Sequence, residues 1–182
     1  MRDRLIEIVR RGLAQLAEPV QLASGDMSSY FVDCKKALAA GADLKLAGQA
    51  LTELAARLDV SFDAVGGLTM GADALAHAVA IHTGSEWFAV RKKEKDRGTR
   101  RRIEGAELGP NRRVLLVDDV VTRAGSILDA LLAIKETGAQ VVAAVALVDR
   151  GVAGEKKFAE AGIPYETVLT YEDLGIPPVG SE

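Results

Sequence analysis

Two adjacent aspartates, Asp118 and Asp119, follow the apolar run Val114–Val117 and precede a stretch with helical periodicity. A turn between a strand and a helix directs several backbone N–H groups outward at the positive end of the helix dipole, where a phosphate can bind. The turn consists of Val120, Val121, Thr122, Arg123, Ala124, Gly125 and Ser126. The hydroxyls of Thr122 and Ser126 could add donors, and the two carboxylates could accept hydrogen bonds from the vicinal hydroxyls of a ribose. The segment therefore predicts a site for a ribose 5-phosphate.

Other interpretations of this segment stay open from the residues alone. Asp118 and Asp119 could simply end a strand, with Ser126 capping a helix. Paired acids also occur in phospho-acceptor receiver domains, but the earlier acid and the late lysine that those domains need cannot be placed here. A Walker-type phosphate loop is excluded, because the sequence has no GK[ST] ending.

A second feature is a strongly basic segment, residues 91–102. Its basic residues are Arg91, Lys92, Lys93, Lys95, Arg97, Arg100, Arg101 and Arg102, and with Glu94 and Asp96 its net charge is +6. The whole chain has a net charge of −3, so the remainder carries −9, which argues against general nucleic-acid binding. Residues 91–112 are long enough for a mobile loop, although a solvated loop or a nucleic-acid patch would also fit this charge.

A glycine-rich segment, Gly66–Gly71, lies between an apolar run and a helical pattern. Its backbone amides could hold a second phosphate group, such as a diphosphate. The glycine pattern alone fits a plain tight turn equally well.

The elements that must position these residues follow from hydrophobic periodicity. Helices are predicted over residues 2–17, 44–58, 72–82, 126–137 and 156–161, and near-continuous apolar strands over residues 62–65, 87–90, 113–117, 141–148 and 165–169. Strands that alternate with amphipathic helices indicate βαβ units, and therefore an α/β fold with a parallel sheet covered on both faces. The loops after Val65, Val90, Val117 and Val148 should then share the edge of the sheet where ligands bind.

Length and composition fit one globular domain over residues 1–182, with 48% hydrophobic and 27% charged residues. Cys34 is the single cysteine, so no internal disulfide framework is possible and a reducing cytoplasm is expected. The N-terminus alternates charged and aliphatic residues, and no apolar stretch approaches about 20 residues. We expect a protein without a targeting segment or membrane contact.

The segment Val114–Ser126 resembles the diphosphoribosyl-binding signature of the type I phosphoribosyltransferases. Further segments match this family in order and near the expected spacing: Ser24-Gly25, Tyr30–Asp33, Phe62–Asp73, Arg91–Gly98 and Val148–Arg150. No short motif is decisive, but the ordered set is specific, and it is most similar to the members that act on orotate. The resemblance implies a central, mostly parallel sheet flanked by helices, with a small N-terminal hood at about residues 18–36.

The resemblance also implies an activity, the transfer of the phosphoribosyl group of 5-phosphoribosyl 1-diphosphate to orotate. Mg²⁺ would be held mainly by substrate and water, without direct protein ligands. The residues implied in binding the donor are Thr69, Met70, Arg91, Lys92, Lys95, Arg97, Asp118, Asp119 and every residue from Val120 to Ser126, and those implied in binding orotate are Tyr30, Phe31, Thr122 and Arg150. The implied catalytic residues are Lys95, Asp118 and Asp119. The implied assembly is a homodimer that shares the loop 91–102 across its interface.

The sequence departs from the family pattern at three places. Ala23 stands where some members have a lysine, and Arg97 stands where a histidine is common, which keeps a charge but loses a group that titrates near neutrality. Arg123-Ala124 replaces a small residue and a glycine, and alanine resists the left-handed backbone conformation that glycine allows. Transfer to another nucleobase, or a non-catalytic sensor of the donor or of a nucleotide, therefore stay open as alternative functions.

Overall fold

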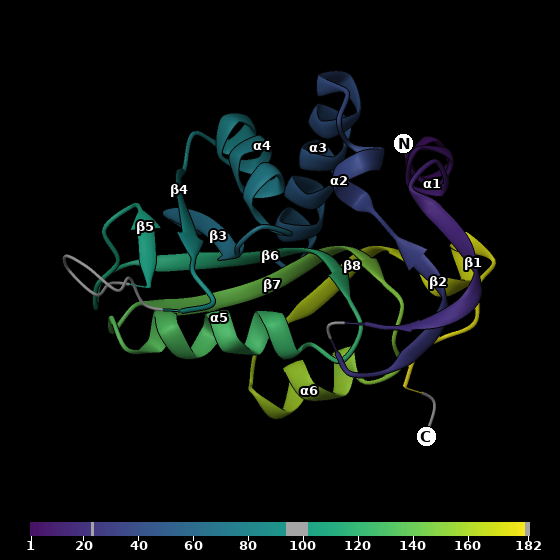
Figure 1. Cartoon of the computed structure of the whole chain (residues 1–182). Coiled ribbons are helices and arrows are strands. Elements are labelled where there is room, and N and C mark those ends of the chain that lie inside the picture. The colour runs from purple at the N-terminus through teal and green to yellow at the C-terminus, as the bar shows by residue number, and fades with distance from the viewer. Residues whose placement is uncertain (23, 94–101, 181–182) are drawn as a thin grey trace.

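A six-stranded sheet forms the centre of the computed structural model, which describes residues 1–22, 24–93 and 102–180 (Figure 1). The strands, in spatial order, are β5 (Ile103–Gly105), β4 (Glu86–Val90), β3 (Ala64–Leu68), β6 (Arg113–Val121), β7 (Gln140–Asp149) and β8 (Tyr165–Thr170). All neighbours pair in parallel except β4 and β5, which pair antiparallel. The predicted α/β fold with a mostly parallel sheet is confirmed.

Helices cover both faces of this sheet. Figure 1 shows α3 (Gly41–Arg57) and α4 (Asp73–Thr83) on one face, and α5 (Gly125–Lys135) and α6 (Gly154–Glu160) on the other. Alternate residues of β6 enter different cores, since Leu115 packs with the α3–α4 side and Leu116 with the α5–α6 side. A strand buried on both faces needs apolar residues at consecutive positions, which explains the apolar runs in the sequence.

The prediction of one helix over residues 2–17 is wrong. Helix α1 ends at Arg10, and Leu13–Gln21 forms strand β1, which pairs antiparallel with β2 (Met27–Val32). Leu13 and Leu16 continue the helical spacing of the preceding residues, but the strand lies mostly at the surface and gives no strong alternating pattern. The β1–β2 hairpin provides the N-terminal hood.

Strand β6 is longer than predicted, because it continues to Val121 instead of ending at Val117. Asp118 pairs with Ala146 and Val120 with Val148, so the ladder with β7 carries both aspartates as strand residues. The strand was predicted to end at Val117 because the polar residues Asp118 and Asp119 follow the apolar run there. Strand β2 was not predicted, and neither were three shorter elements: α2 (Cys34–Ala37), α7 (Tyr171–Leu174) and β5, which lies inside the expected loop 91–112.

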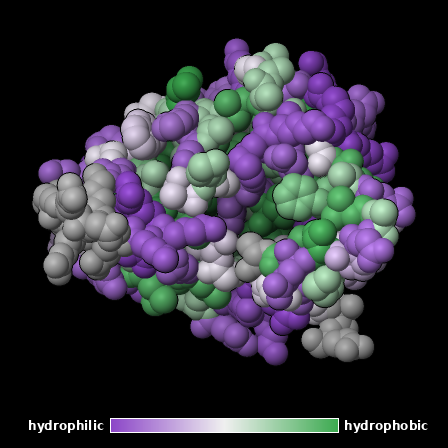
Figure 2. All heavy atoms as spheres, viewed as in Figure 1, coloured by the Kyte–Doolittle hydropathy of each residue, from purple (hydrophilic) through white to green (hydrophobic). Residues whose placement is uncertain are grey.

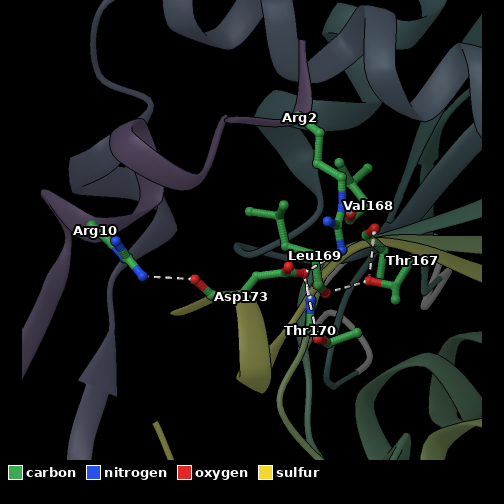
Figure 3. A network of polar contacts seen from close by, with 8 residues as sticks. Arg2, Arg10, Thr167, Val168, Leu169, Thr170 and Asp173 are labelled. Atoms are coloured by element: carbon green, nitrogen blue, oxygen red, sulfur yellow. Dashed lines mark hydrogen bonds and ion pairs between the residues drawn. The ribbon is translucent and has the colours of Figure 1, made fainter. Parts of the chain in front are cut away.

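Helix α1, which precedes the hairpin, is anchored to the C-terminal segment of the chain. Figure 3 shows Asp173 between two arginines of α1. Arg2 Nη2 lies 2.7 Å from Asp173 Oδ2, and Arg10 Nη2 donates to the Asp173 carbonyl over 2.9 Å. Asp173 Oδ2 also accepts from the backbone N–H of Thr170 at 2.8 Å, which caps α7. These contacts hold α1 against α7.

In the described part of the chain, no helix has the length and apolar character needed to cross a bilayer.

Candidate active site

A cavity of about 1290 Å³ lies at the carboxyl ends of β3, β4, β6 and β7, beneath the β1–β2 hairpin. Figure 2 shows a hollow near the centre of this face of the molecule, with hydrophilic surface on one side and apolar surface on the other. The loops after these four strands all contribute lining residues, as the sequence predicted. The cavity wall includes these candidates: Phe31, Thr69, Met70, Arg91, Lys92, Asp118, Asp119, Val120, Val121, Thr122, Arg123, Ala124, Gly125, Ser126 and Arg150.

The turn before α5 has the geometry of an anion site. Ala124 occupies the N-cap position with φ 56° and ψ 11°, in the left-handed region, and no side chain caps the helix there. The first amides of a helix have no intrahelical acceptor, so in this turn they are free for a ligand. Gly125 and Ser126 are exposed to the cavity. Ala124 therefore adopts the left-handed backbone conformation that alanine resists and glycine allows.

The two aspartates at the end of β6 differ in environment. Asp118 is 5% exposed, and its Oδ1 accepts from the N–H of Asp119 at 3.0 Å. Burial, followed by the neighbouring charge of Asp119, raises the pKa of Asp118 to about 8. Asp119 Oδ1 accepts from the N–H of Val120, and its Oδ2 lies 3.7 Å from Lys35 Nζ. This raised pKa favours the protonated form of Asp118 at neutral pH.

The glycine turn after β3 packs directly against these carboxyl groups. A Cβ added to Gly71 would collide with Asp119 Oδ1 and lie 3.2 Å from Asp118 Oδ1. Only a residue without a side chain permits this approach. The backbone that could hold a diphosphate therefore lies beside the carboxylates that could hold a ribose.

An ion pair joins the phosphate turn to the hairpin. Arg123 Nε and Nη2 donate to the two oxygens of Asp26 at 2.7 and 2.5 Å. Ser24 Oγ donates to the same carboxylate at 2.8 Å, and Lys157 Nζ donates to the Arg123 carbonyl at 2.7 Å. The hydrogen bond from Arg123 lowers the pKa of Asp26. The contacts of Asp26 and Lys157 could not be predicted from the sequence, because no local pattern links residues that far apart.

Arg150 connects the end of β7 to the hairpin. It is 2% exposed, with Nη1 donating to the Tyr30 carbonyl at 3.1 Å and Nη2 to Ser28 Oγ at 2.9 Å. Its Nε is buried without a hydrogen-bond partner in the described structure. Neighbouring side chains of a strand point to opposite faces. Accordingly Phe31 lines the cavity, whereas the Tyr30 side chain packs against the hydrophobic core.

The basic segment is described only at its ends. Lys95 and Arg97 lie outside the described residues. The N–H of Arg91 donates to the Arg102 carbonyl at 2.7 Å, and Arg102 Nη2 donates to Asp129 Oδ2 at 2.7 Å. These bonds hold the two ends of the segment together beside α5, next to the cavity.

A parallel sheet with a phosphate turn, paired acids and a glycine turn at one edge matches a known class of proteins. Residues 41–161 match the family model of the phosphoribosyl transferase domain, and the chain belongs to this family. The resemblance found in the sequence is confirmed.

Within this family, several similar curated proteins are orotate phosphoribosyltransferases. That of Corynebacterium glutamicum is 38% identical over 177 residues, covering 96% of this chain and 94% of the relative. That of Streptomyces avermitilis is 44% identical over 164 residues, covering 86% and 88%. A crystal structure of the Mycobacterium tuberculosis orotate phosphoribosyltransferase with Fe(III) dicitrate superposes with a TM-score of 0.82 at 37% identity, covering 96% of this chain and 99% of that one. Another, with 5-phospho-alpha-D-ribosyl 1-diphosphate, gives a TM-score of 0.78 at 34% identity, covering 96% and 99%.

Proposed function

We propose that this chain transfers the phosphoribosyl group of 5-phosphoribosyl 1-diphosphate to N1 of orotate, a step in pyrimidine nucleotide synthesis. The bond from C1 to the diphosphate oxygen breaks, the bond from C1 to N1 forms, and the N1 proton is released. The products are orotidine 5′-monophosphate and diphosphate. The observation that carries this proposal is a single cavity that combines the turn before α5, the acid pair of β6 and the glycine turn after β3.

The phosphate turn and the acid pair would bind the ribose 5-phosphate. The amides of Gly125 and Ser126, with the hydroxyls of Thr122 and Ser126, would hold the phosphate at the start of α5. Asp118 and Asp119 would bind the two ribose hydroxyls. Because positive charge develops on the ribose as the diphosphate leaves, the charged Asp119 also stabilises the transition state.

The leaving diphosphate would contact the turn that contains Thr69 and Met70. Arg91 and Lys92 line the cavity and would contribute positive charge at the same end. The proposed roles of Lys95 as a catalytic residue and of Arg97 rest on the family resemblance, because both lie outside the described residues.

Orotate would lie beneath the hairpin, against Phe31 and near Thr122. The orotate carboxylate is a suitable acceptor for the unpaired Nε of Arg150, since a guanidinium binds a carboxylate with several donors. Tyr30 would act through its carbonyl, which orients Arg150.

We also propose that the enzyme uses Mg²⁺, which would neutralise charge on the leaving diphosphate. Among the described residues, no group of three or more His, Cys, Asp or Glu side chains could hold a metal by itself. At phosphate sites a magnesium ion usually keeps several waters and binds mainly through substrate oxygens. A homodimer sharing residues 91–102 and a cytoplasmic location are further proposals, which follow from the resemblance and from the lone Cys34.

A panel of bases tests the choice of acceptor. The purified chain is incubated with the donor, Mg²⁺ and either orotate, uracil, adenine or hypoxanthine, and nucleotide products are separated by chromatography. We expect product from orotate alone. If another base gives a product, that base is an acceptor and the choice of orotate is wrong. If calorimetry shows donor binding but no base is converted, the protein is a sensor.

A further inference from the structure

The short helix α2 places Lys35 beside the acid pair of β6. Its N-terminus is capped by Asp33, which accepts from the N–H of Lys36 at 3.0 Å. Cys34 is fully buried, with Sγ 3.8 Å from the backbone oxygen of Asp119. Lys35 is the next residue, and its Nζ lies 3.7 Å from Asp119 Oδ2.

This ammonium group lies where the glycine turn and the acid pair meet. Lys35 lines the same cavity as Thr69, Met70 and Gly71. Gly71 itself packs against Asp119 so closely that a Cβ would collide with Asp119 Oδ1. The side chains of Thr69 and Met70 carry no charge, so the turn offers amides but no cation of its own. Lys35 supplies positive charge next to it.

Several other cations of the cavity wall already have protein partners. Arg123 binds Asp26, Lys157 binds the Arg123 carbonyl, Arg150 binds the hairpin, and Arg91 lies 3.7 Å from Glu104. The ion pair of Lys35 with Asp119 is likewise long, at 3.7 Å, and the Lys35 side chain is 51% exposed, compared with 42% for Arg123 and 44% for Arg91. An ammonium group has three donors, so it can contact Asp119 and a ligand oxygen together.

We propose that Lys35 binds the diphosphate group of the donor substrate. This inference rests on the proposed function and assigns a further residue to the same site. A diphosphate beside the charged Asp119 meets repulsion, which the ammonium group offsets. As the bond from C1 to the diphosphate oxygen breaks, the electron pair stays on the diphosphate, and Lys35 stabilises the added negative charge.

Three variants test this role: Lys35→Met, Lys35→Arg and, as matched control, Lys36→Met on the exposed neighbour. Binding of inorganic diphosphate is measured by calorimetry, together with the KM values for the donor and for orotate and the thermal midpoint. We expect Lys35→Met to weaken diphosphate about tenfold, as for one lost charge-assisted hydrogen bond, and to raise the KM of the donor similarly. Lys35→Arg should retain most of the affinity.

Unchanged diphosphate affinity in Lys35→Met would overturn the inference, as would an equal loss of donor and orotate affinity accompanied by a lowered thermal midpoint. If Lys35→Met does not fold, Lys35→Gln provides the same comparison. The outcome is separate from that of the proposed function, because wild-type turnover of orotate is measured first and diphosphate binding needs no acceptor. A wild-type enzyme that turns over orotate while Lys35→Met binds diphosphate normally would refute only the role of Lys35.

Discussion

Arg123 of the phosphate turn and Asp26 of the hairpin are joined by two hydrogen bonds, at 2.7 and 2.5 Å, although they lie 97 positions apart. Arg123 precedes the helix that would bind the 5-phosphate, and Asp26 lies in the hairpin that would cover orotate. The ion pair therefore links the two ends of the cavity. Binding of a substrate at one end of the cavity should therefore favour an ordered backbone at the other end.

Breaking this pair should weaken binding of both substrates with little effect on folding. We expect Arg123→Thr or Asp26→Asn to raise the KM for orotate and for the donor roughly threefold, because a partly exposed ion pair contributes little by itself. The double variant should be no worse than either single one, and the exchange Asp26→Arg with Arg123→Asp should restore part of the affinity. Independent, additive losses would show that the two residues act separately.

The left-handed Ala124 gives a prediction about stability. A non-glycine residue in the left-handed conformation lowers the free energy of unfolding by about 1–2 kcal/mol. A glycine avoids this strain, but it lowers the same free energy by about 0.5–1 kcal/mol through the greater entropy of the unfolded chain, and it lacks the buried methyl group. Ala124→Gly should therefore change the free energy of unfolding by less than about 1 kcal/mol, as these effects oppose one another. Ala124→Val should lower it by more than about 2 kcal/mol, since a β-branched residue fits this conformation poorly.

Urea denaturation measures the free energy of unfolding of both Ala124 variants. The matched control is Gly125→Ala in the same turn, where an added Cβ meets open space and φ is not positive, so stability should be retained. A stable Ala124→Val protein would contradict the assigned backbone conformation.

The close approach of Gly71 to the acid pair predicts a loss of activity. A methyl group at this position would displace the carboxylate of Asp119 and the neighbouring turn. Misplacement of a catalytic group by about 1 Å can cost on the order of 100-fold, and Gly71→Ala should lower kcat/KM for the donor by about that factor. Gly109→Ala, in a loop where an added Cβ meets nothing within 4 Å, should be unaffected. Equal rates for both variants would show that the acid pair does not depend on this contact.

The buried Asp118 predicts a pH dependence of stability. Its pKa is raised to about 8 in the folded chain, mainly by burial, while an unfolded aspartate keeps its ordinary value of 3.8. Between these two values the folded state binds more protons than the unfolded state, so the free energy of unfolding should fall as pH rises from about 4 to about 8. Asp118→Asn should reduce this slope. Some slope should persist, because burial also raises the pKa of Asp149.

Urea titrations from pH 5 to 8.5, each run on wild type and Asp118→Asn, measure the effect. Parallel stability curves for the two proteins would mean that Asp118 is ionised when folded.

The sequence predicted the sheet and the cavity edge well, for a physical reason. Strands such as β7 are buried along nearly their whole length, and burial on both faces leaves a continuous apolar run that cannot be mistaken for a surface element. The turns that follow such strands must meet at one edge. The roles of Asp118, Asp119 and the phosphate turn could therefore be proposed from local pattern alone.

The hairpin and its contacts could not be predicted in this way. Strand β1 is mostly exposed, and its two leucines fit helical spacing as well as they fit a strand. Contacts such as Arg123 with Asp26, or Lys35 with Asp119, depend on tertiary packing between distant segments and leave no periodic signal. Burial of Arg150 under the hairpin likewise depends on where β2 lies.

The most direct test of orotate transfer is the loss of orotate absorbance on mixing the purified chain with 5-phosphoribosyl 1-diphosphate and Mg²⁺. Lys95→Ala serves as the control for a catalytic role of that lysine. We predict that absorbance falls only when the donor is present, that excess diphosphate with orotidine 5′-monophosphate restores it, and that Lys95→Ala slows both directions. Constant orotate absorbance with the folded wild-type chain, donor and Mg²⁺ would contradict the proposed function.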